Sequence, residues 1–141
     1  MAGCPPPIYD VTVGIGYNNV PAILPSSVTL SGLRQQVTHA VISPDGWKVV
    51  GFDTSNTGIV WAVRSKRALF TLDNASSAVW SPDGAMLAVF SPDYSVRIVD
   101  ARTGDVIAFF DGYEGMQLFW SPDSRKFALL AAGVLFIYEA T

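Results

Sequence analysis

The tripeptide Ser-Pro-Asp recurs along this chain and constrains its fold more than any other feature. It begins at residues 43, 81, 91 and 121. The copies at 43, 81 and 121 lie 38 and 40 residues apart, and each follows one short apolar segment and precedes another. A spacing that repeats in this way indicates a chain built from several copies of one supersecondary unit.

Each of these three motifs is predicted to form a tight turn between two antiparallel strands. Proline restricts φ at the first central position of such a turn, and aspartate is tolerated at the second. Glycine follows the motif in two copies, where it accepts a positive φ. The predicted turn residues are Pro44, Asp45, Gly46, Pro82, Asp83, Gly84, Pro122 and Asp123.

Further apolar segments in each repeat are predicted to form a third and a fourth strand. The third strands are expected at residues 59–63, 96–100 and 134–138, and the fourth strands at 68–72 and 106–110. No segment combines apolar residues at helical spacing with capping signals. Four short strands in about 40 residues is the period of a β-propeller blade. The sequence therefore predicts an all-β fold made of blades of four antiparallel strands.

Residues 90–105 resemble the third strand and following turn of a WD-repeat blade. They read Phe-Ser-Pro-Asp-Tyr-Ser-Val-Arg-Ile-Val-Asp-Ala-Arg-Thr-Gly-Asp, where the family has Asp-Gly-Thr-Val-Arg-Leu-Trp-Asp and then Thr-Gly. The resemblance extends from about residue 28 to 141 and fits TolB-like blades as well. The Trp-Asp position holds Trp61-Ala62, Val99-Asp100 and Tyr138-Glu139, and the Gly-His position has no histidine in any repeat. The family's buried His-Ser-Asp-Trp network is therefore not expected here.

The family's strand order implies about three blades. Residues 37–72 form one blade, residues 77–111 a second, and residues 116–139 only three strands of a third. Residues 27–32 are expected to form an outermost strand, which in closed propellers commonly completes the last blade. Closed rings contain roughly four to eight blades. We therefore expect a half-propeller that a second chain completes to a ring.

Residues 1–26 differ from the repeats in composition and in the pattern of apolar residues. The three prolines at 5–7 favour an extended polyproline conformation, and apolar residues alternate at Val11, Val13, Ile15 and Tyr17. We expect an extended N-terminal arm with one strand, suited to lie along the sheet edge of a partner.

An isolated stack of three blades would expose two apolar blade faces. Half of the residues are hydrophobic, and the mean hydropathy is +0.32. Large exposed apolar patches mark interaction sites, so we expect these faces to be covered. The cover would be a second copy in a homodimer, a different chain in a hetero-complex, or further blades of a longer protein of which this chain is a fragment. In the homodimer, the N-terminal strand of each copy would close the third blade of the other. The candidate interface residues are Val28, Leu30, Val41, Ile42, Trp47, Phe119, Trp120 and Phe136.

No catalytic, cofactor-binding or metal site is predicted. Serine nucleophiles need a base, and the single histidine, His39, lies in a predicted strand, so the repeated serines are read as turn residues. One histidine and one cysteine, Cys4, do not provide a metal cluster of the zinc type. The acidic residues match no calcium loop in their spacing.

Charge and hydropathy narrow the classes of partner. The net charge is −3 and the sequence pI is about 4.8, which argues against nucleic acid because its binding needs a basic face. No apolar run reaches the length of a membrane-spanning helix, and the N-terminus does not resemble a signal peptide. A lone cysteine also argues against a disulfide-stabilised secreted domain. We expect an intracellular, cytoplasmic protein.

Two functions from different classes fit these observations. The first is a non-enzymatic scaffold for protein–protein interaction that assembles into a full propeller. The second is a truncated or accessory propeller domain of an enzyme such as a serine peptidase, with the catalytic residues outside this chain. A small structural subunit of a large assembly is a further alternative.

Overall fold

A computed structural model describes residues 9–15, 26–112 and 115–140, and within these residues the chain is all-β. The strands are β1 (Tyr9–Ile15), β2 (Ser26–Leu33), β3 (Val37–Ile42), β4 (Lys48–Asp53), β5 (Gly58–Ala62), β6 (Arg67–Leu72), β7 (Ser77–Trp80), β8 (Met86–Phe90), β9 (Val96–Asp100), β10 (Val106–Phe110), β11 (Gln117–Trp120), β12 (Lys126–Ala131) and β13 (Val134–Glu139).

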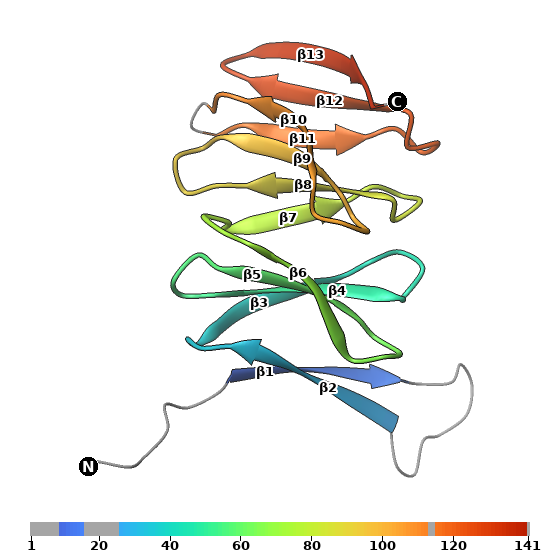
Figure 1. Cartoon of the computed structure of the whole chain (residues 1–141). Coiled ribbons are helices and arrows are strands. Elements are labelled where there is room, and N and C mark those ends of the chain that lie inside the picture. The colour runs from blue at the N-terminus through green and yellow to red at the C-terminus, as the bar shows by residue number, and fades with distance from the viewer. Residues whose placement is uncertain (1–8, 16–25, 113–114, 141) are drawn as a thin grey trace.

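The strands form four sheets that lie one upon another in chain order (Figure 1). Strands β1 and β2 make a two-stranded N-terminal hairpin. Strands β3–β6 make blade 1, β7–β10 make blade 2, and β11–β13 make the three-stranded blade 3. Neighbouring strands are antiparallel and consecutive in sequence. The expected all-β fold with four-stranded antiparallel blades is confirmed.

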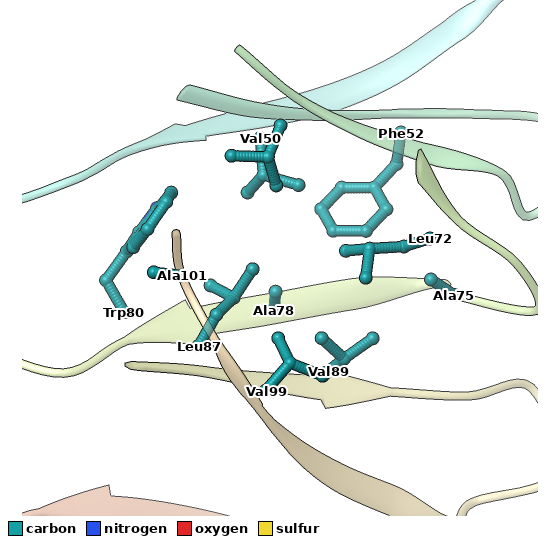
Figure 2. Close-up of a cluster of buried hydrophobic side chains, with 11 residues drawn as sticks. Val50, Phe52, Leu72, Ala75, Ala78, Trp80, Leu87, Val89, Val99 and Ala101 are labelled. Carbon is teal, nitrogen blue, oxygen red and sulfur yellow. The ribbon is translucent and has the colours of Figure 1, made fainter. Parts of the chain in front are cut away.

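The three apolar cores lie between successive sheets. Figure 2 shows the core between blades 1 and 2, where Val50 and Phe52 face Leu87 and Val89. A second core joins the N-terminal hairpin to blade 1, and a third joins blade 2 to blade 3. The central strands β4, β5, β8 and β9 are buried along nearly their whole length because a sheet covers each of their faces. Burial of these apolar side chains is the main favourable contribution to folding.

The Ser-Pro-Asp turns repeat one hydrogen-bond pattern. The serine Oγ donates to the aspartate Oδ1 at 2.7 Å in blade 1, 2.7 Å in blade 2 and 2.6 Å in blade 3. The same Oγ accepts from the backbone N–H five residues later, at 2.9–3.0 Å. The residue after the motif has a positive φ in all three turns: 76° at Gly46, 72° at Gly84 and 62° at Ser124.

The N-terminal segment differs from the free arm that the sequence suggested. Residues 1–8 and 16–25, including Tyr17, lie outside the described residues. Residues 9–15 form β1, which pairs with β2 of the same chain from Tyr9 opposite Leu33 to Ile15 opposite Ser26. The strand expected at 27–32 is therefore already paired within its own chain, at the opposite end of the stack from β13 (Figure 1).

The N-terminal hairpin packs on the far face of blade 1. Val11 and Leu30 are buried there against blade 1. The indole N–H of Trp61 donates to the carbonyl of Ser31 at 2.9 Å. On the other side of the hairpin, Thr12 and Thr29 are exposed, with their hydroxyl oxygens 3.5 Å apart. The hairpin thus covers an apolar face of blade 1 and presents polar side chains to solvent.

Candidate interaction surface

Blade 3 ends the stack with an apolar face that no sheet of the described residues covers. Because side chains directly opposite in antiparallel strands share a face, the register places Phe119, Ala128 and Ile137 in one row. Leu130 and Leu135 lie in the adjoining row. The exposed fraction is 52% for Phe119, 57% for Leu135 and 68% for Ile137. We call these five residues the outer face of blade 3.

A shallow pocket opens at one end of the outer face. It has a volume of about 310 Å³ and is lined by Phe119, Trp120, Ser121, Lys126, Phe127, Ala128 and Ile137. At the same end, Lys126 lies opposite Glu139 across the β12–β13 pair, and both side chains are exposed. The outer face therefore combines an apolar centre with one positive and one negative charge at its rim.

Trp120 has an unsatisfied hydrogen-bond donor. In blade 2, the equivalent Trp80 donates its indole N–H to the carbonyl of Val41 in blade 1 at 3.0 Å. The indole nitrogen of Trp120 is buried, and no acceptor among the described residues lies within hydrogen-bonding distance. A buried donor without a partner is costly. The indole N–H in blade 3 therefore lacks the acceptor that its equivalent in blade 2 has.

The predicted interface residues are divided between solvent and core. Phe119 belongs to the outer face, half-buried Trp120 lines its pocket, and Phe136 is exposed on the opposite face of the same sheet. Ile42 and Trp47 are exposed on blade 1. The guanidinium of Arg64 lies 3.8 Å from the ring centroid of Trp47.

Two of the predicted interface residues are corrected by the structure. Leu30 is 0% exposed because it packs between the N-terminal hairpin and blade 1. Val41 is half-buried and packs against the core between blades 1 and 2. Both residues lie in interfaces between sheets of one chain. For Val28 only the backbone is described, and it pairs with Val13.

The sequence interpretation missed Leu130, Leu135 and Ile137. Residues 134–138 are apolar at five consecutive positions. A strand with only one covered face alternates apolar and polar residues, whereas this segment does not. That lack of alternation was the available signal that β13 has apolar side chains on both faces.

The repeated Ser-Asp pairs hold the turns and do not form a catalytic arrangement among the described residues. In blade 3, the Ser121 hydroxyl and the backbone N–H of Arg125 donate to Asp123 and lower its pKa. Burial raises the pKa of Asp83, but hydrogen bonds from Ala85 N–H and two serine hydroxyl groups outweigh it and leave the pKa lowered. These carboxylates therefore stay ionised as acceptors.

His39, the single histidine, makes one ring-stacking contact and one side-chain hydrogen bond. His39 is exposed and stacks on Phe52 with 4.8 Å between the ring centroids. Its Nδ1 lies 3.1 Å from the hydroxyl of Thr38. Within the part of the chain that the structure describes, no three His, Cys, Asp or Glu side chains are grouped to hold a metal ion.

Comparison with solved structures supports propeller-type blades. A chain in the crystal structure of the mitotic checkpoint complex matches 80% of this chain with a TM-score of 0.62 and 23% sequence identity. This chain covers 38% of that chain. No family model and no curated protein matches the sequence. Among the described residues, no helix is long and apolar enough to cross a membrane. The chain has the fold of a stack of propeller-type blades.

Proposed function

We propose that this protein is a non-enzymatic protein-interaction module that binds through the outer face of blade 3. The observation that carries the proposal is the difference between the two ends of the stack. The N-terminal hairpin covers one end with the polar side chains of Thr12 and Thr29, whereas blade 3 exposes Phe119 and Ile137 at the other. An exposed apolar patch with a polar rim is typical of a protein-binding surface.

The partner we propose is a second copy of the chain, bound face to face through blade 3. This replaces the ring of two half-propellers, in which blade 3 of one copy would meet the N-terminal end of the other. Burying the hydroxyl groups of Thr12 and Thr29 against an apolar face would leave them without water. Two outer faces related by a two-fold axis instead bury apolar side chains on both sides.

We place this module inside the cell as part of the same proposal. The single cysteine of the chain, Cys4, favours a reducing compartment over a disulfide-stabilised secreted domain.

The oligomeric state in solution tests the proposal. Light scattering coupled to gel filtration should give about twice the chain mass of 15.2 kDa. Ile137→Asp should give the mass of one chain, because it places a charge at the centre of the contact. Ile42→Asp is the matched control, since Ile42 is also exposed but lies on blade 1, and it should leave the dimer intact. A wild-type mass of one chain throughout the micromolar range would overturn the homodimer.

A further inference from the structure

The turn between β5 and β6 of blade 1 carries a cluster of positive charge. Arg64, Lys66 and Arg67 lie within four consecutive residues, and all three are exposed. The guanidinium of Arg64 lies over the ring of Trp47, 3.8 Å from its centroid, and Trp47 is 45% exposed. A hydrogen bond of 2.9 Å from the N–H of Val63 to the carbonyl of Trp47 joins the two turns. We call Trp47, Arg64, Lys66 and Arg67 the basic turn of blade 1.

The backbone of the basic turn repeats in blade 2. In blade 1 the N–H of Lys66 donates to the carbonyl of Ala62 at 2.9 Å. In blade 2 the N–H of Gly104 donates to the carbonyl of Asp100 at 2.8 Å. Both donors have a positive φ, 61° at Lys66 and 81° at Gly104. The two turns therefore have the same geometry with different side chains.

The charges of the two turns differ. Residues 100–105 of blade 2 carry one positive and two negative charges, and Arg102 pairs with Asp100 at 3.6 Å. Residues 62–67 of blade 1 carry three positive charges and no negative one, because Ala62 stands in the place of that aspartate. The positive charge thus belongs to one blade and is not a property of the repeat.

The basic turn has no carboxylate partner among the described residues. None of its three charges forms an ion pair there. Of the twelve acidic residues of the chain, Glu114 alone lies outside the described residues. Three like charges so close together repel one another, and a bound anion would remove that repulsion.

Acidic neighbours restrict the size of such an anion. The carboxylate of Asp45 accepts from the backbone N–H of Trp47 at 3.0 Å. The acidic turn of blade 2 packs on β6, because a Cβ added at Gly104 would lie 2.7 Å from the ring of Phe70. Successive phosphates of a nucleic acid, or the headgroups of an anionic membrane, would meet these carboxylates and be repelled. The site therefore favours a compact anion.

We propose that the basic turn of blade 1 binds a phosphorylated serine or threonine in a segment of a partner protein. A phosphorylated side chain carries about two negative charges and three acceptor oxygens in a compact group. An arginine guanidinium binds phosphate through two parallel N–H bonds, and contact with the ring of Trp47 limits the movement of Arg64. The proposal goes beyond the function proposed above, because the site lies on blade 1 and does not use the outer face of blade 3.

The apolar surface beside the basic turn indicates what flanks the phosphorylated residue. Trp47 remains partly exposed beside Arg64, and Leu69, two residues after Arg67, is 39% exposed. We therefore expect an apolar residue next to the phosphorylated one in the bound segment.

Three immobilised peptide libraries test the inference with the full chain. They share degenerate flanking positions and differ at the central residue, which is phosphoserine, serine or glutamate. The phosphoserine library should retain the chain, and the serine library should not. The glutamate library separates a phosphate from a carboxylate and should retain the chain about tenfold more weakly, because a carboxylate has less charge and fewer acceptor oxygens.

The two turns supply matched variants. Arg64→Ala should weaken retention by the phosphoserine library about tenfold or more, because a charge-assisted hydrogen bond is lost. Arg102→Ala removes one positive charge from the equivalent turn of blade 2 and should leave retention within about twofold. Ala62→Asp introduces the carboxylate that blade 2 has at this position, and it should weaken retention without removal of any basic side chain.

Lys66→Gly separates binding from folding. Glycine is the residue that blade 2 has at this position of positive φ, so the substitution should leave the urea midpoint unchanged or raise it. Loss of the lysine charge should weaken retention by the phosphoserine library about threefold. A purely structural role of Lys66 would not weaken retention while the fold keeps its stability.

The outcomes separate this site from its alternatives and from the dimer. Retention by the phosphoserine library that is no stronger than by the other two, or that survives both Arg64→Ala and Lys66→Gly, overturns the phosphate site. Stronger binding in the same salt to vesicles that contain phosphatidylserine, or to single-stranded RNA, would overturn the assignment to a protein segment. Arg64→Ala should keep the mass of the wild type in light scattering, and Ile137→Asp should keep phosphoserine binding, so the failure of one proposal leaves the other standing.

Discussion

The side chain of one aspartate organises each Ser-Pro-Asp turn. In blade 2, Asp83 Oδ1 accepts from the Ser81 hydroxyl and from the Ala85 N–H. The backbone N–H of Asp83 donates to the hydroxyl oxygen of Ser124 in blade 3 at 3.0 Å. The turn therefore satisfies its own polar groups and also contacts the turn of the next blade. Hydrogen bonds of this kind pair backbone groups that a turn would otherwise leave without a partner.

We predict that Gly84→Val lowers the free energy of unfolding by about 1 kcal/mol or more. Gly84 has φ 72°, and a β-branched side chain is strongly disfavoured at positive φ. A Cβ there would also lie 3.4 Å from the carboxylate of Asp45 in blade 1. Urea unfolding monitored by tryptophan fluorescence measures the change.

Gly46→Val separates these two causes. Gly46 has nearly the same φ, 76°, but a Cβ added there meets nothing within 4 Å. We expect a smaller loss of stability at Gly46 than at Gly84, because only the backbone strain is common to both. Unchanged unfolding midpoints in both variants would contradict the positive-φ turn.

At the residue scale, the sequence predicts local features and misses those that depend on packing. The turn at residues 43–46 could be anticipated because proline, aspartate and glycine act on their own backbone. The burial of Leu30 could not, because it depends on Trp61, which lies 31 positions later in the chain. Sequence spacing alone does not reveal such a contact.

The N-terminal hairpin is the element that differs most from the expected arrangement. Its two strands were both visible as alternating or apolar segments. Their pairing was not, because residues 16–25 separate them and a connection of that length has no two-residue turn signature. The position of the hairpin on blade 1 likewise follows from long-range packing around Gly51 and Trp61.

We predict that Gly51→Val displaces the N-terminal hairpin. A Cβ at Gly51 would lie 2.9 Å from the ring of Trp61 and 3.0 Å from the side chain of Val11, so the larger valine needs one of them to move. Hydrogen exchange should become faster at the backbone amides of residues 26–33, and slow exchange should persist in β8 and β9.

Ala40→Val is the matched control for this element. Ala40 lies directly opposite Gly51 in the β3–β4 pair and is exposed. Its substitution should leave the exchange rates of the hairpin unchanged. Unaltered protection of residues 26–33 in Gly51→Val would show that the hairpin does not depend on close approach at this glycine.

At the scale of the whole molecule, we expect acid to destabilise the fold because the aspartates of the turns become protonated. Hydrogen bonds lower the pKa of five aspartates, which are Asp45, Asp83, Asp93, Asp100 and Asp123. A carboxylate whose pKa is lower in the folded state stabilises the fold above its unfolded pKa, and this stabilisation is lost as the pH falls through the folded pKa. We expect the urea midpoint to fall progressively below about pH 4.

Asp83→Asn tests the origin of this acid sensitivity. The variant should be less stable than the wild type at pH 7 and should lose less stability between pH 5 and pH 3, because one of the five carboxylates no longer titrates. A wild-type midpoint that rises on acidification over the same range would contradict this assignment.

In the proposed assembly, the polar outer side of the N-terminal hairpin would also limit how far the protein can polymerise. In polymer chemistry, a monomer with one reactive end is monofunctional: two such monomers join and growth stops. In the proposed assembly the stack would have one such end, because of its two ends, within the described residues, the hairpin presents Thr12 and Thr29 whereas blade 3 presents an apolar face. A stack with apolar faces at both ends would be bifunctional, and head-to-tail contacts that do not close produce open fibres. If the proposed contact forms, a few hydroxyl groups on a two-stranded hairpin would act as a chain terminator, far from the surface where the contact lies.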